Sequence, residues 1–216
     1  MNALQLIHLD SGETDYWTPP EIIKTVRDFL GQIDLDPASS AKCNRESVKA
    51  KRYFTAPKAT LDGSMGHDGL PILKRQGRGG LDEPWDADCV WINHPFAKAE
   101  SACELGCEKK VCKNRGYHIS TPQNSNDDWV QKMVLEHREG RARNILCITY
   151  AATSEKWYQP LLARPQCNLY PRTNYLTPDG KPLPGVSKGS SITYFGKDVH
   201  RFATCFNKHG IVKVAM

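Results

Sequence analysis

Amphipathic helical segments alternate with short β-prone runs along this chain, and the alternation restricts the fold more than any other feature. Residues 19–30 and residues 127–138 place apolar side chains at helical spacing. Residues 33–36, 89–93 and 144–150 are short runs of mostly apolar and β-branched residues. Helices that alternate with buried strands form parallel α/β units. The pattern therefore predicts an α/β fold with a mostly parallel central sheet.

Local signals place the ends of these elements. Thr18 is predicted as the N-cap of the first helix and Pro19 as its first helical residue. Gly140 is predicted to stop the second helix. Residues 190–195 and residues 201–206 are expected to be late strands joined by a short turn.

The length of 216 residues suits one domain over residues 1–216 that carries a Cys/His insertion at residues 100–120. Residues 56–83 are rich in Gly and Pro and are expected to be a long surface excursion. No apolar run approaches the roughly 20 residues of a membrane span, so no membrane partner is expected. The N-terminus does not resemble a secretory signal, and a cytoplasmic protein is expected.

Asp36 and Asn93 are both predicted at the carboxyl ends of strands, where open α/β sheets bind their ligands. A carboxylate at that place can meet the ammonium group or ribose hydroxyls of a nucleoside cofactor. The local alternative is that Asp36-Pro37 only starts a turn. Likewise, Thr18-Pro19 can be no more than a helix cap.

The tetrapeptide Asn93-His94-Pro95-Phe96 offers groups that methylation of an exocyclic amine requires. The Asn93 side chain and the His94 carbonyl can accept the hydrogens of the amine and favour a tetrahedral nitrogen. Phe96 can stack on a base that has left the duplex. The alternative is a chance tetrapeptide in which Phe96 belongs to the core.

Together these segments resemble the phage-type DNA N6-adenine methyltransferase family, whose members use S-adenosylmethionine. The resemblance covers roughly residues 15–96, and residues 172–195 are also similar to the C-terminal part of the family. The matching segments are Tyr-Trp-Thr-Pro at 16–19, Leu-Asp-Pro-Ala at 35–38, Arg-Tyr-Phe-Thr at 52–55, Gly80-Leu81 before Trp85, and Asn-His-Pro-Phe at 93–96.

This resemblance implies a Rossmann-like S-adenosylmethionine methyltransferase fold and methyl transfer to N6 of adenine in DNA. It implies a bacterial host cell and a phage or prophage origin. The implied catalytic residues are Asn93, His94, Pro95 and Phe96, and the implied cofactor-binding residues are Trp17, Thr18, Pro19, Asp36, Pro37 and Ala38. The sequence departs from the usual Asn-Pro-Pro-Phe pattern, because His94 replaces the first proline, and it lacks a glycine-rich turn after Asp36.

Three other functions remain open on these residues. The same acceptors suit the N4 amine of cytosine, or a base in RNA. A relative that binds nucleic acid without turnover is a further alternative, motivated by His94. A nuclease is disfavoured, because the sequence has no cluster of carboxylates at metal-binding spacing.

Three of the eight cysteines and one histidine lie within 16 residues. Cys103, Cys107, Cys112 and His118 are predicted to enclose a structural zinc ion with no open position, and the alternatives are free thiols or a redox pair. The other cysteines are expected to be structural thiols: Cys43, Cys89, Cys147, Cys167 and Cys205.

A formal net charge of +5 permits nucleic-acid binding. Basic residues around the Cys/His segment, and one in the polar loop 180–189, are predicted to meet DNA phosphates. These residues are Lys109, Lys110, Lys113, Arg115 and Lys188. Ordinary solvated surface charge is the alternative.

Overall fold

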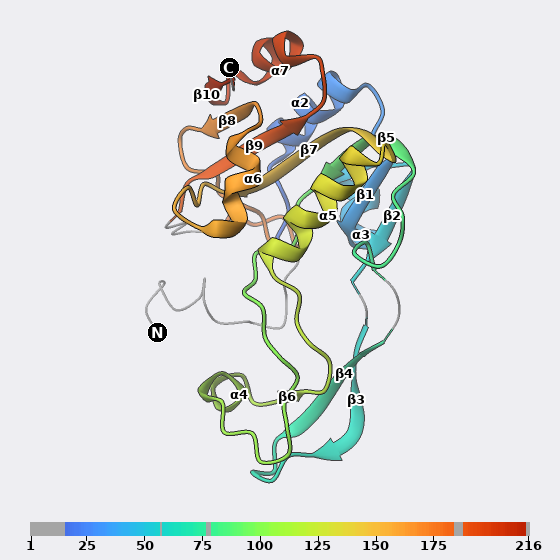
Figure 1. Cartoon of the computed structure of the whole chain (residues 1–216), viewed down its shortest axis with the longest axis vertical. Coiled ribbons are helices and arrows are strands. Elements are labelled where there is room, and N and C mark those ends of the chain that lie inside the picture. Colours follow the sequence, from blue (N-terminus) through green and yellow to red (C-terminus); the bar gives the residue numbers. More distant parts are fainter. Residues whose placement is uncertain (1–15, 57, 77–78, 184–187, 215–216) are drawn as a thin grey trace.

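The computed structural model describes residues 16–56, 58–76, 79–183 and 188–214, and its main body is built on one seven-stranded sheet (Figure 1). The strands are β1 (Leu35–Ser39), β2 (Arg52–Thr55), β5 (Ala87–Ile92), β7 (Ala142–Tyr150), β8 (Gln166–Leu169), β9 (Ser190–Phe195) and β10 (Gly210–Lys213). Their order is β10-β8-β9-β7-β5-β1-β2. The expected α/β class is confirmed.

The sheet is parallel in its core and antiparallel toward one side. Strands β2, β1, β5 and β7 pair in parallel. Strand β9 pairs antiparallel with both β7 and β8, and β10 pairs antiparallel with β8. The sheet is therefore mixed, and the prediction of a mostly parallel sheet is confirmed for its core strands.

Helices cover both faces of this sheet. Helices α2 (Pro20–Leu30) and α7 (Val199–Phe206) contribute to one apolar layer, and α5 (Asn126–Arg138) and α6 (Gln159–Leu162) contribute to the other. Shorter turns are α3 (Ala41–Cys43), the π-helical η1 (Asn44–Val48) and the 3-10 helix η2 (Lys156–Tyr158). Within the described residues, none of the helices combines the length and apolar character needed to cross a membrane.

Alternation along the strands assigns side chains to the two layers, because successive side chains of a strand point to opposite faces. On β5, Val90 and Ile92 belong to the layer of α5, and Trp91 belongs to the layer of α2. On β7, Ile145 packs with α5 and Leu146 with α2. This parity determines which layer each residue after a strand end can reach.

Residues 201–206 were expected to be a strand, and that prediction is wrong. They belong to α7, which begins where the Asp198 carboxylate accepts a hydrogen bond from the Arg201 backbone N–H at 3.1 Å. Phe202 and Phe206 are both fully buried. Two aromatic residues four positions apart fit the period of a strand and that of a helix equally well, and the cap and the packing against α2 decide for the helix.

Two element boundaries differ from the sequence prediction. Pro19 is the N-cap of α2 and the helix begins at Pro20, so Thr18 is not its cap. Strand β1 continues through Pro37 to Ser39, with a register shift against β2 between Asp36 and Ser39. The predicted stop at Gly140 agrees with its positive φ of 72° directly after α5.

A second, three-stranded sheet projects from the main body as a lobe, which we define as residues 58–76 and 100–123 (Figure 1). It contains β3 (Lys58–Met65), β4 (Pro71–Gln76), the short helix α4 (Lys110–Arg115) and β6 (His118–Ile119). Glu100 and Gln123 pair where the second segment leaves and re-enters the main body. The surface excursion expected over 56–83 thus contains a β3–β4 hairpin, which joins the Cys/His segment.

Glu136 of α5 is a buried carboxylate that ties three parts of the main body together. Its side chain accepts hydrogen bonds from the Trp85 backbone N–H at 3.2 Å and from Arg141 Nε at 2.8 Å. Lys132 Nζ lies 2.9 Å away. Burial acts to raise the pKa of Glu136, but the bonds from Arg141 and Lys132 outweigh it and hold the pKa below its ordinary value.

We expect Glu136→Ala to lower the free energy of unfolding by about 2 to 3 kcal/mol, because it leaves a buried backbone N–H and two partly exposed cations without their acceptor. Urea denaturation of the variant measures the change. Glu139→Ala is the matched control, since Glu139 is exposed and pairs with exposed Arg138. The control should lose less than about 1 kcal/mol. Equal losses in the two variants would contradict the role given to Glu136.

Candidate functional site

A cavity opens where β1 and β5 separate. Strand β1 leads to β2 on one side and lies beside β5 on the other, so the strand order reverses there, and such switch points are the usual ligand sites of open α/β sheets. Strand β1 pairs with β5 at Leu35 and Val90. The cavity is small, with a volume of about 30 Å³, and is lined by Tyr16, Thr18, Asp36, Ala38, Cys43, Val48, Trp91, Asn93 and Pro95.

Strand parity brings Asp36 and Asn93 to the same cavity. Leu35 packs in the α5 layer, so the next residue, Asp36, faces the α2 layer. Trp91 packs in the α2 layer, and Asn93, two positions further, faces the same way. The two residues expected at separate strand ends thus line one cavity.

The polar groups of the cavity are held in defined orientations. The Asp36 carboxylate is 3% exposed and accepts a hydrogen bond from the Ala38 backbone N–H at 3.1 Å. Asn93 Nδ2 donates to the Tyr16 carbonyl at 2.8 Å, which leaves the amide oxygen as the accepting end of that side chain. Thr18 Oγ1 is buried and has no hydrogen-bond partner among the described residues. A buried hydroxyl without a partner costs about 1 to 3 kcal/mol, so the Thr18 hydroxyl favours a polar ligand in the cavity.

The other residues expected to bind the cofactor do not line the cavity. Trp17 pairs with Leu176 through two backbone hydrogen bonds of 2.8 Å, and Pro19 caps α2. Pro37 lies against Gly80, where a Cβ would come within 1.9 Å of the Pro37 carbonyl oxygen, so only glycine fits. Thr18, Asp36 and Ala38 therefore line the cavity, and Trp17, Pro19 and Pro37 lie beside it.

Residues 93–95 of the loop after β5 divide between the two layers in the same alternating way, whereas Phe96 packs in the α2 layer. Asn93 and Pro95 line the cavity. The His94 ring turns to the opposite layer and stacks on Trp129, with ring centroids 5.8 Å apart and planes inclined by 11°. The Phe96 ring packs on Tyr150, with centroids 4.3 Å apart.

His94 is neutral at neutral pH. Its ring is 1% exposed, and burial lowers its pKa to about 4. Nδ1 lies 3.0 Å from the Pro95 carbonyl oxygen, which fits a neutral ring that donates from Nδ1. Nε2 has no hydrogen-bond partner among the residues that the structure describes. The His94 imidazole, which the Asn-Pro-Pro-Phe pattern lacks, is therefore not part of the cavity.

Four lining residues were not assigned from the sequence: Tyr16, Cys43, Val48 and Trp91. Cys43 and Val48 come from α3 and η1, a helical turn that the sequence analysis missed. Its signal is Ser40, whose hydroxyl accepts from the Cys43 backbone N–H at 3.1 Å. Lys188 Nζ lies 5.5 Å from the centroid of the Tyr150 ring, on which Phe96 packs.

The second candidate site is the Cys/His cluster of the lobe. The ligand atoms of Cys103, Cys107, Cys112 and His118 all lie within 4.8 Å of one another. The Sγ atom of Cys112 is 3.5 Å from that of Cys103 and 3.9 Å from that of Cys107. Zinc–sulfur bonds of about 2.3 Å at the tetrahedral angle place two sulfurs roughly 3.8 Å apart. The cluster could therefore hold a metal ion such as zinc.

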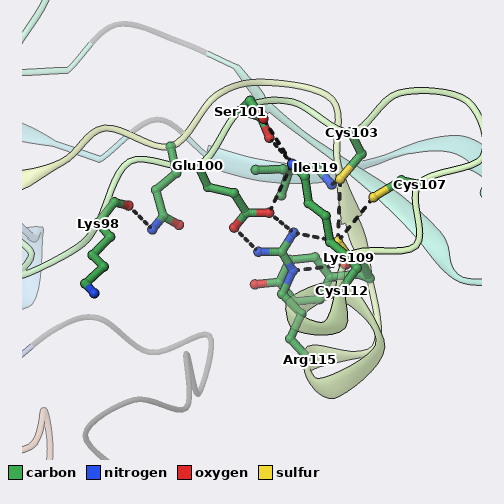
Figure 2. A network of polar contacts seen from close by, with 11 residues as sticks. Lys98, Glu100, Ser101, Cys103, Cys107, Lys109, Cys112, Arg115 and Ile119 are labelled. Atoms are coloured by element: carbon green, nitrogen blue, oxygen red, sulfur yellow. Dashed lines mark hydrogen bonds and ion pairs between the residues drawn. The ribbon is translucent and has the colours of Figure 1, made fainter.

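Hydrogen-bond donors surround the sulfur atoms. Figure 2 shows the Glu100 carboxylate bound to the Arg115 guanidinium, at 2.7 and 3.1 Å, and Arg115 also donates to Cys112 Sγ at 3.5 Å. Burial acts to raise the pKa of Cys103, but the hydrogen bond from the Ile119 backbone N–H and the proximity of the His118 ring outweigh it and lower the pKa to about 7. The donors to Cys103 stabilise its thiolate, which is the form that binds metal. Burial, by contrast, raises the pKa of Cys112 to about 12.

Two of the five basic residues expected to contact DNA are engaged within the lobe. The Arg115 side chain is 4% exposed and bound to Glu100. Lys109 Nζ donates to the Ser101 carbonyl at 2.6 Å (Figure 2). The other three of these five residues, Lys110, Lys113 and Lys188, are exposed.

Comparison of the chain with known protein families, with curated proteins and with solved structures finds no match.

The burial of His94 predicts a specific loss of stability in acid. The unfolded state binds a proton near pH 6.5, whereas the folded state binds it only near pH 4, so stability falls as the pH drops through this window. The loss amounts to at most about 3 kcal/mol. His94→Phe keeps a ring on Trp129 and should lack this component, as measured by urea denaturation at a series of pH values.

His200→Phe, an exposed position on α7, is the control and should keep the acid sensitivity of the unaltered protein. Carboxylates contribute to both variants and cancel in the comparison. If the two variants show the same dependence on pH, His94 does not carry the effect.

Proposed function

We propose that the protein is an S-adenosylmethionine-dependent methyltransferase with a Rossmann-like fold, which acts on the N6 amine of adenine in DNA. The observation that carries the proposal is the shared cavity of Asp36 and Asn93 at the switch point of the sheet. A carboxylate within β1 and an amide directly after the neighbouring β5 are the groups needed for a nucleoside cofactor and an acceptor amine. The resemblance of residues 15–96 supplies the identity of both ligands.

Three groups that line the cavity suit the methyl donor. The buried Asp36 carboxylate is an acceptor for ribose hydroxyls or an ammonium group. The unpartnered Thr18 hydroxyl supports a polar ligand at this place, and Trp91 provides an apolar surface. S-adenosylmethionine supplies an electrophilic methyl group on a sulfonium centre.

Asn93 and the backbone of His94 are assigned to the acceptor amine. The hydrogen bond to the Tyr16 carbonyl orients the Asn93 amide before any substrate arrives, and such preorganised groups cost no reorganisation during the reaction. Accepting the hydrogens of the amine draws its lone pair out of conjugation with the ring. Histidine in place of proline keeps the backbone carbonyl of residue 94. The His94 side chain is buried in the other layer, where it stacks on Trp129.

Phe96 is assigned to stack on the extruded base, with Tyr150 and Tyr175 packed behind it at centroid distances of 4.3 and 5.9 Å. The exposed cations Lys110, Lys113 and Lys188 support a DNA phosphate backbone as the partner. A structural zinc ion in the Cys/His cluster completes the proposal, since four protein ligands leave no open position for catalysis.

Asn93→Ala should lower kcat roughly a hundredfold or more, because it removes one preorganised acceptor of the transition state. The protein is incubated with DNA and S-adenosylmethionine, and the digested nucleosides are quantified by mass spectrometry. Asn114→Ala in the lobe, at an exposed position, is the control and should keep full activity. Full activity of Asn93→Ala would refute the assignment of the acceptor site.

Asp36→Ala should mainly weaken the binding of the cofactor, whereas Asn93→Ala should mainly lower kcat. Cofactor affinity, measured by calorimetry with S-adenosylmethionine, should fall by an order of magnitude or more, as expected when a hydrogen bond to a charged group is lost. Asn93→Ala should bind the cofactor within a few-fold of the unaltered protein. Methylated cytosine or RNA as the product would redirect the proposal to those substrates, and cofactor binding without any product would favour the inactive relative.

A further inference from the structure

The lobe has almost no apolar core of its own. Among its described residues, the buried apolar side chains are Cys112 and Ile119, whereas Leu61, Met65 and Leu105 are exposed. Strand β6 pairs with β4 over only two residue pairs. A unit this small cannot be held by so little apolar burial, so a cross-link must supply its stability.

His118 joins the hairpin to the metal cluster through its two ring nitrogens. Nε2 lies 3.0 Å from Asp68 Oδ1, in the turn between β3 and β4. Nδ1 is buried without a hydrogen-bond partner among the described residues, and it is the nitrogen that remains for the cluster. A metal-binding imidazole commonly donates its second N–H to a carboxylate, which fixes the tautomer and the orientation of the ring.

The turn that carries Asp68 is shaped around this contact. The Leu70 backbone N–H donates to Asp68 Oδ1 at 3.2 Å, and the Gly66 N–H donates to the Leu70 carbonyl at 2.7 Å. A Cβ on Gly66 would come within 2.6 Å of His118 Cδ2 and 2.9 Å of Asp68 Oδ1. The hairpin thus passes directly over the imidazole, at a distance that only glycine permits.

We infer that Asp68 is the positioning carboxylate of a zinc centre formed by Cys103, Cys107, Cys112 and His118, and that the bound metal fastens the β3–β4 hairpin to the Cys/His segment. The lobe is then one metal-dependent folding unit made from two segments that β5 separates in the sequence. This inference rests on the zinc part of the proposed function and is independent of methyl transfer.

The full-length protein is titrated with Zn²⁺ against a competing chelator. Asp68→Ala should weaken zinc binding 10- to 100-fold, the usual effect of removing such a partner. Asp68→Asn keeps an oxygen acceptor without the charge, so its zinc affinity should lie between those of the unaltered protein and Asp68→Ala. Glu108→Ala, an exposed acidic position in the same segment, is the control for the lost charge. Zinc affinity of Asp68→Ala equal to that of Glu108→Ala would overturn the inference.

Co²⁺ substitution separates a positioning role from general damage to the lobe. The ligand-field bands of the Co²⁺-loaded Asp68→Asn protein should keep their tetrahedral thiolate character, since the four ligands remain, while Co²⁺ dissociates faster. Loss of those bands would make Asp68 a requirement for the fold of the cluster and would overturn a positioning role. Asp68→Asn is nearly isosteric and serves if the alanine variant fails to fold.

Hydrogen exchange tests whether the metal fastens the hairpin. Removal of zinc should expose the amides of β4 to exchange while those of β5 and β7 stay protected. In zinc-saturated Asp68→Ala, β4 should lose protection while α4 retains it. Protection of β4 that does not depend on zinc would overturn the inference. A protein that binds no zinc would also overturn it, whatever its activity toward DNA, whereas a failure to methylate would leave these results unchanged.

Discussion

The divergence of β1 and β5 is the constraint on which the candidate active site depends. Strand β1 pairs with β5 at Leu35 and Val90, and Pro37, two residues further along β1, has no N–H with which to continue the ladder. Beyond that point, Asp36 and Asn93 reach into a common space on the α2 face of the sheet. The register shift of β1 against β2 accommodates Pro37, whose carbonyl lies against Gly80. The cavity is therefore a product of sheet geometry as much as of the polar residues in it.

The same alternation explains how the loop after β5 tolerates a histidine. Residues 93 and 95 face the cavity, so residue 94 must face the α5 layer, where Trp129 offers a flat apolar surface. A ring in that position is buried and neutral, and it can influence a ligand in the cavity only through the backbone. Histidine in place of proline therefore changes the packing of the core, and its expected consequence is a lower stability of the folded protein in acid.

The lobe follows a different physical principle from the main body. The main body buries two apolar layers around its sheet, whereas the lobe presents thiols and an imidazole at the place where a core would be. Its charged residues serve this arrangement: Arg115 joins Glu100 to Cys112, and Asp68 holds His118. Local sequence predicted the four ligands from their spacing, but Asp68 lies 35 residues before the first of them, and only the folded chain brings it there.

The sequence by itself determined the α/β class, most helices and strands of the main body, the position of Asn93 directly after a strand, and the Cys/His cluster, whereas Asp36, expected at a strand end, lies inside β1. These features depend on periodicity, capping and spacing within a few residues. Tertiary structure decided that residues 201–206 form a helix, that residues 58–76 form a hairpin, and that the Thr18 hydroxyl lies unpartnered at the cavity. It also decided that Tyr16 orients Asn93. Each of these outcomes depends on contacts between distant segments, whose energies exceed the small differences in local propensity that a sequence pattern records.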